Sequence, residues 1–314
     1  MNDPSTTPVD IEEQRAWIID HKDTMAMSWS QLAKRTGIAQ GTLSQFASAR
    51  GYAGDELKVA EQVARYRQLL ASQASIEVDV PEIPVFFETE TSRTLETMLI
   101  FAQRGQMIAA ALEAGLGKTR AARHFQVCYP NVVHVELRKS AANVNNMQIM
   151  VLKAMGEKNP VGSPLKMSDR ICEMFSKLGQ PLLILDEAQH LSENSIEEVR
   201  GWYDDIGLGV AFFGNVGVLQ KLQRYPQLYS RLSMKTQRNL PLNSDVAALA
   251  DAWGIFDEAQ RNQLLKICMT LGGLRNGTMA LQLATMIAAA DRKPLEVGHL
   301  QDAWAQLSSR TVLG

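Results

Sequence analysis

The chain has 314 residues, of which 46% are hydrophobic and 21% are charged. This length exceeds that of a single ordinary domain, so we expect two or three domains that each bury an apolar core. The formal net charge is only −2 at pH 7, which excludes a global positive field, so any binding to nucleic acid must come from local basic clusters.

Cysteine usage and hydropathy indicate a reducing compartment. The cysteines Cys128, Cys172 and Cys268 lie far apart and form no C-x-x-C pair, which argues against a disulfide framework or a zinc cluster and predicts buried free thiols. The chain starts with polar and acidic residues, and no apolar run approaches the roughly 18 residues of a membrane span. We therefore expect a cytoplasmic protein without a membrane partner.

Residues 1–70 are predicted to form a small all-helical domain, because helical patterns alternate there with polar or glycine-containing turns. The stretch QLAKRTGIAQGTLSQF has the spacing of a helix-turn-helix. The small Ala33 occupies the crossing of the two helices, Gly37 lies in the turn, and the apolar Leu43 pins the second helix.

One face of this domain is locally basic, since no acidic residue occurs from Thr24 to Gly54 and Arg50 adds positive charge. The second helix exposes polar side chains that can contact bases or phosphates. The alternative is a helical protein-interaction module that does not contact DNA. The predicted DNA-binding residues of the domain are Lys34, Arg35, Gln40, Thr42, Ser44 and Gln45.

The rest of the chain is predicted to contain a linker, an α/β core and a second helical domain. Residues 71–90 include Pro81 and Pro84 among short polar and acidic residues, which favours an extended linker. Residues 91–241 alternate buried strands with helices, the pattern of a parallel sheet, and residues 242–314 are again helical. The predicted strands are 107–112, 131–137, 181–187 and 209–215.

The segment LEAGLGKT ends as a phosphate-binding loop does, with Lys118 and Thr119 in the last two positions of G-x-x-x-x-G-K-[ST], but Leu112 replaces the first glycine. A strand precedes the segment and a helix follows it, so helix amides would face the phosphates. Lys118 would reach the β/γ-phosphates and the Thr119 hydroxyl would bind Mg²⁺. The alternatives are a degenerate loop and a chance match. The predicted nucleotide-binding residues are Gly115, Leu116, Gly117, Lys118, Thr119 and Arg120.

Two later strands end in polar residues that suit the same site. In PLLILDEAQH, Asp186 follows four apolar residues and would hold the metal, while the adjacent Glu187 would polarise an attacking water. In GVAFFGN, Asn215 ends another buried strand and could orient that water. The alternative for both is an ordinary polar turn at the end of a core strand.

The order of these motifs resembles that of the AAA+ ATPases, and this resemblance implies an AAA+ P-loop core followed by a helical lid. It also implies that Arg231, in QLYSRL, reaches the γ-phosphate of a neighbouring subunit, with Arg224 as the alternative finger. Arg275, in GGLRN, would contact the nucleotide from the lid. A finger that acts on a neighbour requires self-assembly, with ATP bound between subunits.

A second basic cluster spans 216–240, where no acidic residue occurs. Its cations either line a DNA path through the assembled ATPase or form a solvated surface. The AAA+ resemblance adds Arg138 and Lys139 as weaker DNA-binding candidates, because loops in their position often point toward a central pore. The cations of the cluster are Lys221, Arg224, Arg231, Lys235 and Arg238.

The whole arrangement resembles the transposition protein B family of bacteriophage Mu, which are target-selection ATPases. The likeness runs from about Trp29 to Leu307 and includes TGIAQGTLSQF, the linker end PVFFETETS, GLGKTRAAR, LLILDEAQHL, FFGN, YSRL and GGLRN. It implies a filament that assembles with ATP and Mg²⁺ on double-stranded DNA in the bacterial host cytoplasm and presents that DNA to a transposase. Hydrolysis, stimulated by DNA and by the transposase, would disassemble the filament and keep insertions away from the element's own ends.

Two other classes of protein fit the same motifs. A helicase loader or replication-initiation ATPase would share the core and bind DNA, but its partner would be a replicative helicase. A regulator that binds DNA without hydrolysing ATP would use a degenerate loop as a nucleotide sensor, and the replacement at Leu112 permits this.

Overall fold

A computed structural model of the protein describes residues 9–48, 52–76 and 86–309. The chain divides into two compact units, residues 1–79 and residues 80–314. Among the described residues, no helix combines the length and the apolar character that crossing a bilayer requires.

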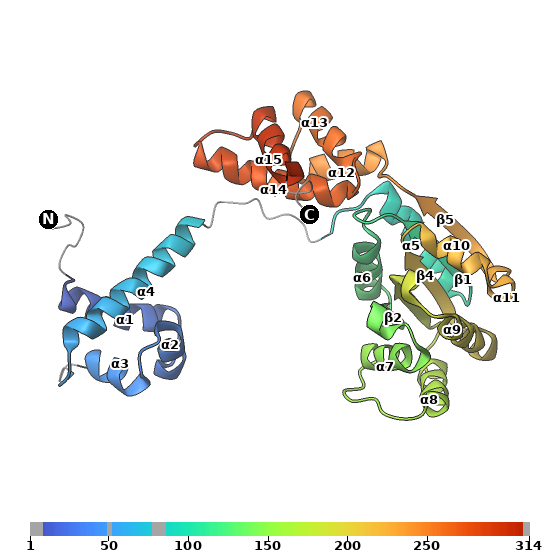
Figure 1. The fold of residues 1–314 in the computed structure, drawn as a ribbon, viewed down its shortest axis with the longest axis horizontal. Coiled ribbons are helices and arrows are strands. Elements are labelled where there is room, and N and C mark those ends of the chain that lie inside the picture. The colour runs from blue at the N-terminus through green and yellow to red at the C-terminus, as the bar shows by residue number, and fades with distance from the viewer. Residues whose placement is uncertain (1–8, 49–51, 77–85, 310–314) are drawn as a thin grey trace. The chain divides into compact units, whose positions relative to one another are not determined.

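The first unit is helical, as predicted (Figure 1). The side chain of Ser28 accepts a hydrogen bond from the Gln31 amide at the start of the second helix, and Gly37 ends that helix with φ of 69°. Apolar residues from all of the helices form one core. The helices are α1 (Ile11–Thr24), α2 (Trp29–Thr36), α3 (Gln40–Phe46) and α4 (Glu56–Ile76).

The linker is shorter than predicted. Residues 71–76 continue α4 rather than running extended, because this stretch precedes both prolines and contains alanine and glutamine, which favour helix. The other end of the predicted linker, Glu90, already opens the helix α5 (Glu90–Gln103). Pro81 and Pro84 lie outside the described residues.

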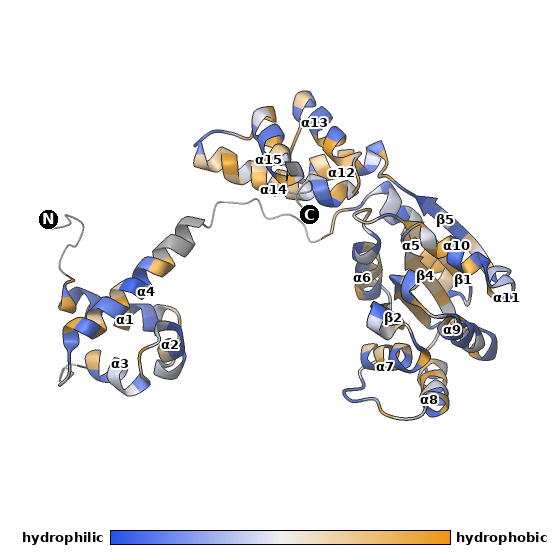
Figure 2. Ribbon diagram, in the orientation of Figure 1, coloured by the Kyte–Doolittle hydropathy of each residue, from blue (hydrophilic) through white to orange (hydrophobic). Residues whose placement is uncertain are grey.

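The second unit is built on a five-stranded parallel sheet with the order β2-β3-β4-β1-β5 (Figure 1). The four predicted strands are present, and β5 is an additional strand that the sequence pattern did not predict. Figure 2 shows why, since β5 is mostly hydrophilic whereas β1 and β4 are hydrophobic. The strands are β1 (Met107–Leu112), β2 (Val132–Glu136), β3 (Leu182–Asp186), β4 (Gly209–Gly214) and β5 (Leu232–Arg238).

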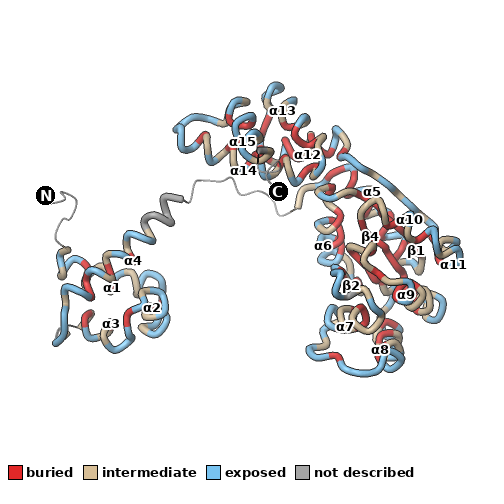
Figure 3. The backbone as a smooth tube through the Cα atoms, viewed as in Figure 1, coloured by how far each residue is buried: buried red, intermediate tan, exposed pale blue. Residues whose placement is uncertain are grey.

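Helices cover both faces of this sheet. Alternate residues of β1 point to opposite faces, so that Ile108 packs with α5 and α6 whereas Ala109 packs with the helices of the other face. The strands β1, β3 and β4 are buried between these layers, whereas β5, at the edge of the sheet, is partly exposed (Figure 3). Besides α5, the helices of this core are α6 (Lys118–Cys128), α7 (Val144–Ala154), α8 (Pro164–Ser176), α9 (Glu193–Ile206), α10 (Gly217–Gln223) and α11 (Pro226–Tyr229).

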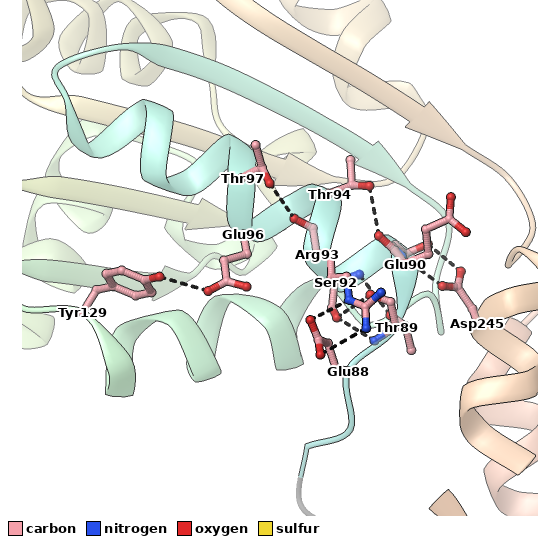
Figure 4. A network of polar contacts seen from close by, with 11 residues as sticks. Glu88, Thr89, Glu90, Ser92, Arg93, Thr94, Glu96, Thr97, Tyr129 and Asp245 are labelled. Carbon is pink, nitrogen blue, oxygen red and sulfur yellow. Dashed lines mark hydrogen bonds and ion pairs between the residues drawn. The ribbon is translucent and has the colours of Figure 1, made fainter. Parts of the chain in front are cut away.

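The C-terminal part of the unit forms a helical lid with its own apolar core. A buried carboxylate joins the lid to the sheet domain: Asp245, 1% exposed, accepts hydrogen bonds from the amide and the hydroxyl of Thr91 in α5. Figure 4 shows Asp245 beside the first turn of α5. The helices of the lid are α12 (Asn243–Ala252), α13 (Glu258–Cys268), α14 (Gly273–Ala290) and α15 (Val297–Ser309).

The prediction that the thiols are buried is correct for Cys268 only. Cys128 is exposed at the last position of α6, and Cys172 is half-buried in α8. None of the three forms a disulfide.

Candidate nucleotide site

The GKT segment forms a loop between a buried strand and the start of a helix. β1 ends at Leu112, the loop follows, and α6 begins at Lys118. Gly115 and Gly117 have φ of 84° and 87°, conformations that favour glycine. Leu112 is itself the last residue of the strand, pairs with Arg238 of β5 and is 1% exposed. Leucine is accommodated there because the position needs a buried strand residue rather than a turn.

Lys118 is buried in the loop, with 5% of the residue exposed. Its Nζ donates to the carbonyl oxygen of Leu112 at 2.6 Å and to that of Glu113 at 3.1 Å. Burial lowers the pKa of this amine, and the nearby carboxylates Asp186 and Glu187 oppose that effect. The lysine is thus held at the mouth of the loop by neutral carbonyl groups, which an anion can displace.

Thr119 and Asp186 meet although they come from different elements. The Thr119 hydroxyl donates to Asp186 Oδ2, and the amide of Glu187 donates to Oδ1 at 2.9 Å. Burial of the Asp186 carboxyl raises its pKa, but the neighbouring His134 and the hydrogen bonds from Thr119 and the Glu187 amide outweigh burial and leave the pKa below its usual value. His134 Nε2 lies 3.7 Å from Asp186 Oδ2.

These oxygens fit Mg²⁺. Among the described residues no cluster of three or more His, Cys, Asp or Glu side chains could hold a metal by itself. Mg²⁺ in nucleotide sites needs only one or two protein ligands, because phosphates and water supply the others. A hydroxyl beside an ionised carboxylate, as at Thr119 and Asp186, provides that ligand set.

Glu187 and Asn215 follow β3 and β4 at the same edge of the sheet. Glu187 has φ of 56° and lines the cavity beside the loop. The Asn215 side-chain oxygen accepts from the amide of Gly217, the first residue of α10, at 3.0 Å, and its side-chain nitrogen has no partner among the described residues. Asn215 is therefore fixed by its oxygen, and its nitrogen can donate to a bound group.

A cavity of about 230 Å³ lies between the loop and the lid. Its polar side carries the predicted residues Arg120 and Arg275 together with the loop and Glu187. The other side of the cavity is apolar, and the sequence analysis did not predict it. Phe86 was assigned to the linker, and no sequence pattern indicated that apolar residues of the lid would line the site. The apolar lining consists of Phe86, Phe87, Leu274 and Met279. A cavity with one polar and one apolar side suits a nucleotide, with phosphates at the loop and the base at the aromatic end.

The two candidate fingers differ in their surroundings. Arg231 directly precedes β5, whose first residue pairs with Met107, so it lies at the edge of the sheet opposite the phosphate loop. It forms a two-point ion pair with Asp204, with Nε at 2.7 Å from Oδ1 and Nη2 at 2.9 Å from Oδ2. Arg224 is exposed and has no ion pair among the described residues.

The remaining basic cluster is largely occupied by internal contacts. The Lys221 amine donates to the carbonyls of Gln189 and Leu191, and Lys235 lies over the Tyr229 ring at 4.7 Å. Arg238 has a buried, unpaired Nη1. This favours the interpretation that the cluster is not one continuous DNA-binding surface.

The predicted DNA-binding side chains are accessible to different degrees. In the first unit Lys34, Arg35, Gln40 and Gln45 are exposed, whereas Thr42 and Ser44 are half-buried. Arg50 lies outside the described residues. In the second unit Arg138 and Lys139 are exposed and follow β2. They lie at the same edge of the sheet as the GKT loop but do not line the cavity.

Comparison with family models matches two parts of the chain. Residues 103–222 match an AAA domain, and residues 230–307 match the C-terminal part of the Mu B transposition protein.

Whole-chain relatives extend these matches. The ATP-dependent target DNA activator B of Escherichia phage Mu is 28% identical over 305 residues, 95% of each chain. The Mu-like prophage FluMu DNA transposition protein B of Haemophilus influenzae is 30% identical over 264 residues, which cover 81% of this chain and 90% of that protein.

Solved structures share the fold of the second unit. The ORC2 protein of Aeropyrum pernix superposes with a TM-score of 0.55 at 13% identity, covering 68% of this chain and 66% of that one. A chain of Drosophila ORC bound to DNA gives a TM-score of 0.53 at 18% identity, covering 76% and 66%. At these identities the likeness establishes the AAA+ fold alone.

Proposed function

The chain belongs to the Mu B transposition protein family, and from this membership we propose that it is a DNA-dependent ATPase that delivers target DNA to a transposase. ATP binding assembles subunits into a filament on double-stranded DNA in the bacterial cytoplasm, and hydrolysis releases them. The observation that carries the proposal is the meeting of Lys118, the Thr119–Asp186 pair and Glu187 around one cavity.

Five residues in or beside the cavity have distinct parts in the proposed hydrolysis. Lys118 exchanges its two carbonyl partners for phosphate oxygens, and Thr119 and Asp186 would hold Mg²⁺, which would neutralise charge on the phosphates. Glu187 accepts a proton as water attacks the γ-phosphorus, and the bond to the bridging oxygen breaks to give ADP and phosphate. Asn215 orients the water.

The positions of the arginines support the proposed assembly. Arg275 lines the cavity of its own subunit, whereas Arg231 and Arg224 lie away from it and can complete the site of a neighbour. ATP then increases subunit association, since the γ-phosphate contacts both chains. Electron microscopy of the protein with DNA and a non-hydrolysable ATP analogue should show filaments, and isolated monomers would contradict this step.

DNA contact is assigned to the exposed cations of α2 and the polar face of α3. The double variant Lys34→Ala/Arg35→Ala should weaken DNA binding and reduce the salt dependence of log Kd by about 0.9 for each phosphate that the variant no longer neutralises. Lys177→Ala, an exposed lysine of the second unit paired with Glu173, is the control and should leave both quantities unchanged.

The central test is phosphate release with and without DNA. Wild-type turnover should rise on adding DNA, and Lys118→Ala or Glu187→Gln should reduce it by about two orders of magnitude or more. Lys177→Ala should remain as active as wild type. Absence of turnover in the wild-type protein that nevertheless binds ATP would support the non-hydrolysing regulator instead. Capture of a replicative helicase rather than a transposase would support the helicase loader.

A further inference from the structure

Gln189 connects two parts of the site that the motifs treat separately. Its side-chain nitrogen donates to Glu187 Oε2 at 2.5 Å, and its side-chain oxygen accepts from the backbone amide of Asn215 at 3.3 Å. The side-chain amide of Gln189 therefore links the Glu187 carboxylate, after β3, to the backbone at the end of β4, through its nitrogen on one side and its oxygen on the other.

The surroundings of Gln189 leave room for this bridge and fix the backbone that carries it. Gly214 lies opposite the amide, and a Cβ built on this glycine would stand 2.5 Å from Gln189 Oε1. On the other side the Lys221 amine donates to the Gln189 carbonyl oxygen at 2.8 Å and also to that of Leu191. The hydrogen bonds from Lys221 thus hold the backbone at Gln189, and the absence of a side chain at Gly214 leaves space for the Gln189 amide group.

We propose that Gln189 is a positioning residue that orients Glu187 for proton abstraction; this inference rests on the proposed ATPase function. The hydrogen bond from Gln189 occupies Oε2 of Glu187, and Oε1 has no donor among the described residues. The carboxylate is thereby held by one oxygen and offers the other to water. Because Gln189 also binds the Asn215 backbone, the base and the water-orienting residue keep a fixed separation.

A purely structural role predicts something different. If Gln189 only tied its turn to β4, the essential contact would be the acceptor bond from the Asn215 amide. Gln189→Glu keeps the shape of the side chain and an oxygen that can accept this bond. It removes the donor to Glu187 and places a second negative charge beside that carboxylate. The two roles therefore separate in this variant.

The experiment compares steady-state hydrolysis by the full chain for Gln189→Ala and Gln189→Glu. Both variants should lower kcat by at least about tenfold while KM for ATP stays within about threefold, because a displaced base affects the chemical step and not phosphate binding. Gln103→Ala serves as the control, since Gln103 also donates through its side chain, to the Pro130 carbonyl at 2.7 Å, but lies away from the site. It should keep wild-type kinetics.

Wild-type kcat in Gln189→Glu would overturn the proposal, and so would a rise in KM without a fall in kcat. Thermal melting identifies a variant that fails to fold, and because Gln189→Glu is isosteric it remains informative if Gln189→Ala unfolds. Glu187→Gln is measured in parallel. Activity retained by Glu187→Gln would refute the proposed ATPase mechanism itself, whereas loss there with full activity in Gln189→Glu would refute only the role of Gln189.

Discussion

Gly115 of the phosphate loop lies against Gly272 of the lid so closely that a Cβ on Gly115 would stand 1.8 Å from the Gly272 carbonyl oxygen. The next lid residue also lies close to the loop, since a Cβ on Gly273 would stand 2.9 Å from a methyl carbon of Leu116. The lid segment that carries Arg275 therefore touches the loop backbone. We therefore expect ATP binding at the loop to be coupled to the position of the lid.

Gly115→Ala should separate the lid from the loop. The methyl group meets a backbone carbonyl, which cannot rotate away, and alanine at φ of 84° is itself strained by roughly 1–2 kcal/mol. We expect a lower melting temperature and an ATP affinity reduced at least about tenfold. Gly298→Ala is the control, because a Cβ there has no atom within 4 Å and alanine favours the helix α15; it should leave the ATP affinity unchanged and should not lower the melting temperature. Unchanged ATP affinity in Gly115→Ala would contradict the coupling.

The bond between Thr91 and Asp245 should stabilise the junction of core and lid. Thr91→Val keeps the side-chain shape but removes the hydroxyl that donates to this buried carboxylate, at a cost of about 1–3 kcal/mol. Thr94→Val on the same helix removes an exposed hydroxyl bonded to the Glu90 carbonyl and should cost about 0.5 kcal/mol or less. Urea unfolding of both variants measures the difference, and equal midpoints would show that the buried bond contributes nothing.

The finger can be identified by mixing inactive subunits. Arg231→Ala should bind ATP normally but hydrolyse it at least about tenfold more slowly, since a finger acts only on a neighbour's phosphate. Adding Lys118→Ala subunits, whose own sites are dead but whose Arg231 is intact, should restore activity. To act, Arg231 must leave Asp204, whereas Arg224 forms no ion pair within the part of the chain that the structure describes. The same mixing experiment is done with Arg224→Ala. If Lys118→Ala subunits restore the activity of Arg224→Ala but not that of Arg231→Ala, the finger is Arg224.

Thiol reactivity should follow burial. Burial raises the pKa of Cys172 to about 11 and that of Cys268 to about 12, so at pH 8 about one molecule in a thousand or fewer carries either thiolate. The exposed Cys128 should be the thiol that reacts rapidly with 5,5′-dithiobis(2-nitrobenzoic acid) in the native protein. All three should react after denaturation in guanidinium chloride. Rapid reaction of two or three thiols in the native state would contradict the packing of α8 and α13.

Local patterns in the sequence were sufficient for the four buried strands, the loop and the acidic pair. A run such as MIAAAL is buried on both faces, so its hydrophobicity alone indicates a strand. Glycine at Gly115 and Gly117 similarly reflects a backbone requirement of a few neighbouring residues. The sequence also predicted that the loop and the acidic pair lie close together, because the carboxyl ends of parallel strands meet at the same edge of a sheet.

The strand β5 and most of the site's supporting contacts could not be predicted in this way. β5 lies at the sheet edge, where one face is solvated, and its sequence LSMKTQR lacks a continuous apolar run. Gln189, between Glu187 and the Asn215 backbone, depends on how the ends of two strands are placed. No local pattern carries that information.

The sequence by itself determined which residues are the candidates for binding phosphate and for its chemistry, since that choice depends on residue type and on backbone conformation over a few positions. Only the tertiary structure decided what surrounds them: the aromatic side of the cavity, the contact of Gly115 with Gly272 and the pairing of Arg231 with Asp204. These contacts join segments that are far apart along the chain, and their geometry is set by the packing of the sheet, its helices and the lid.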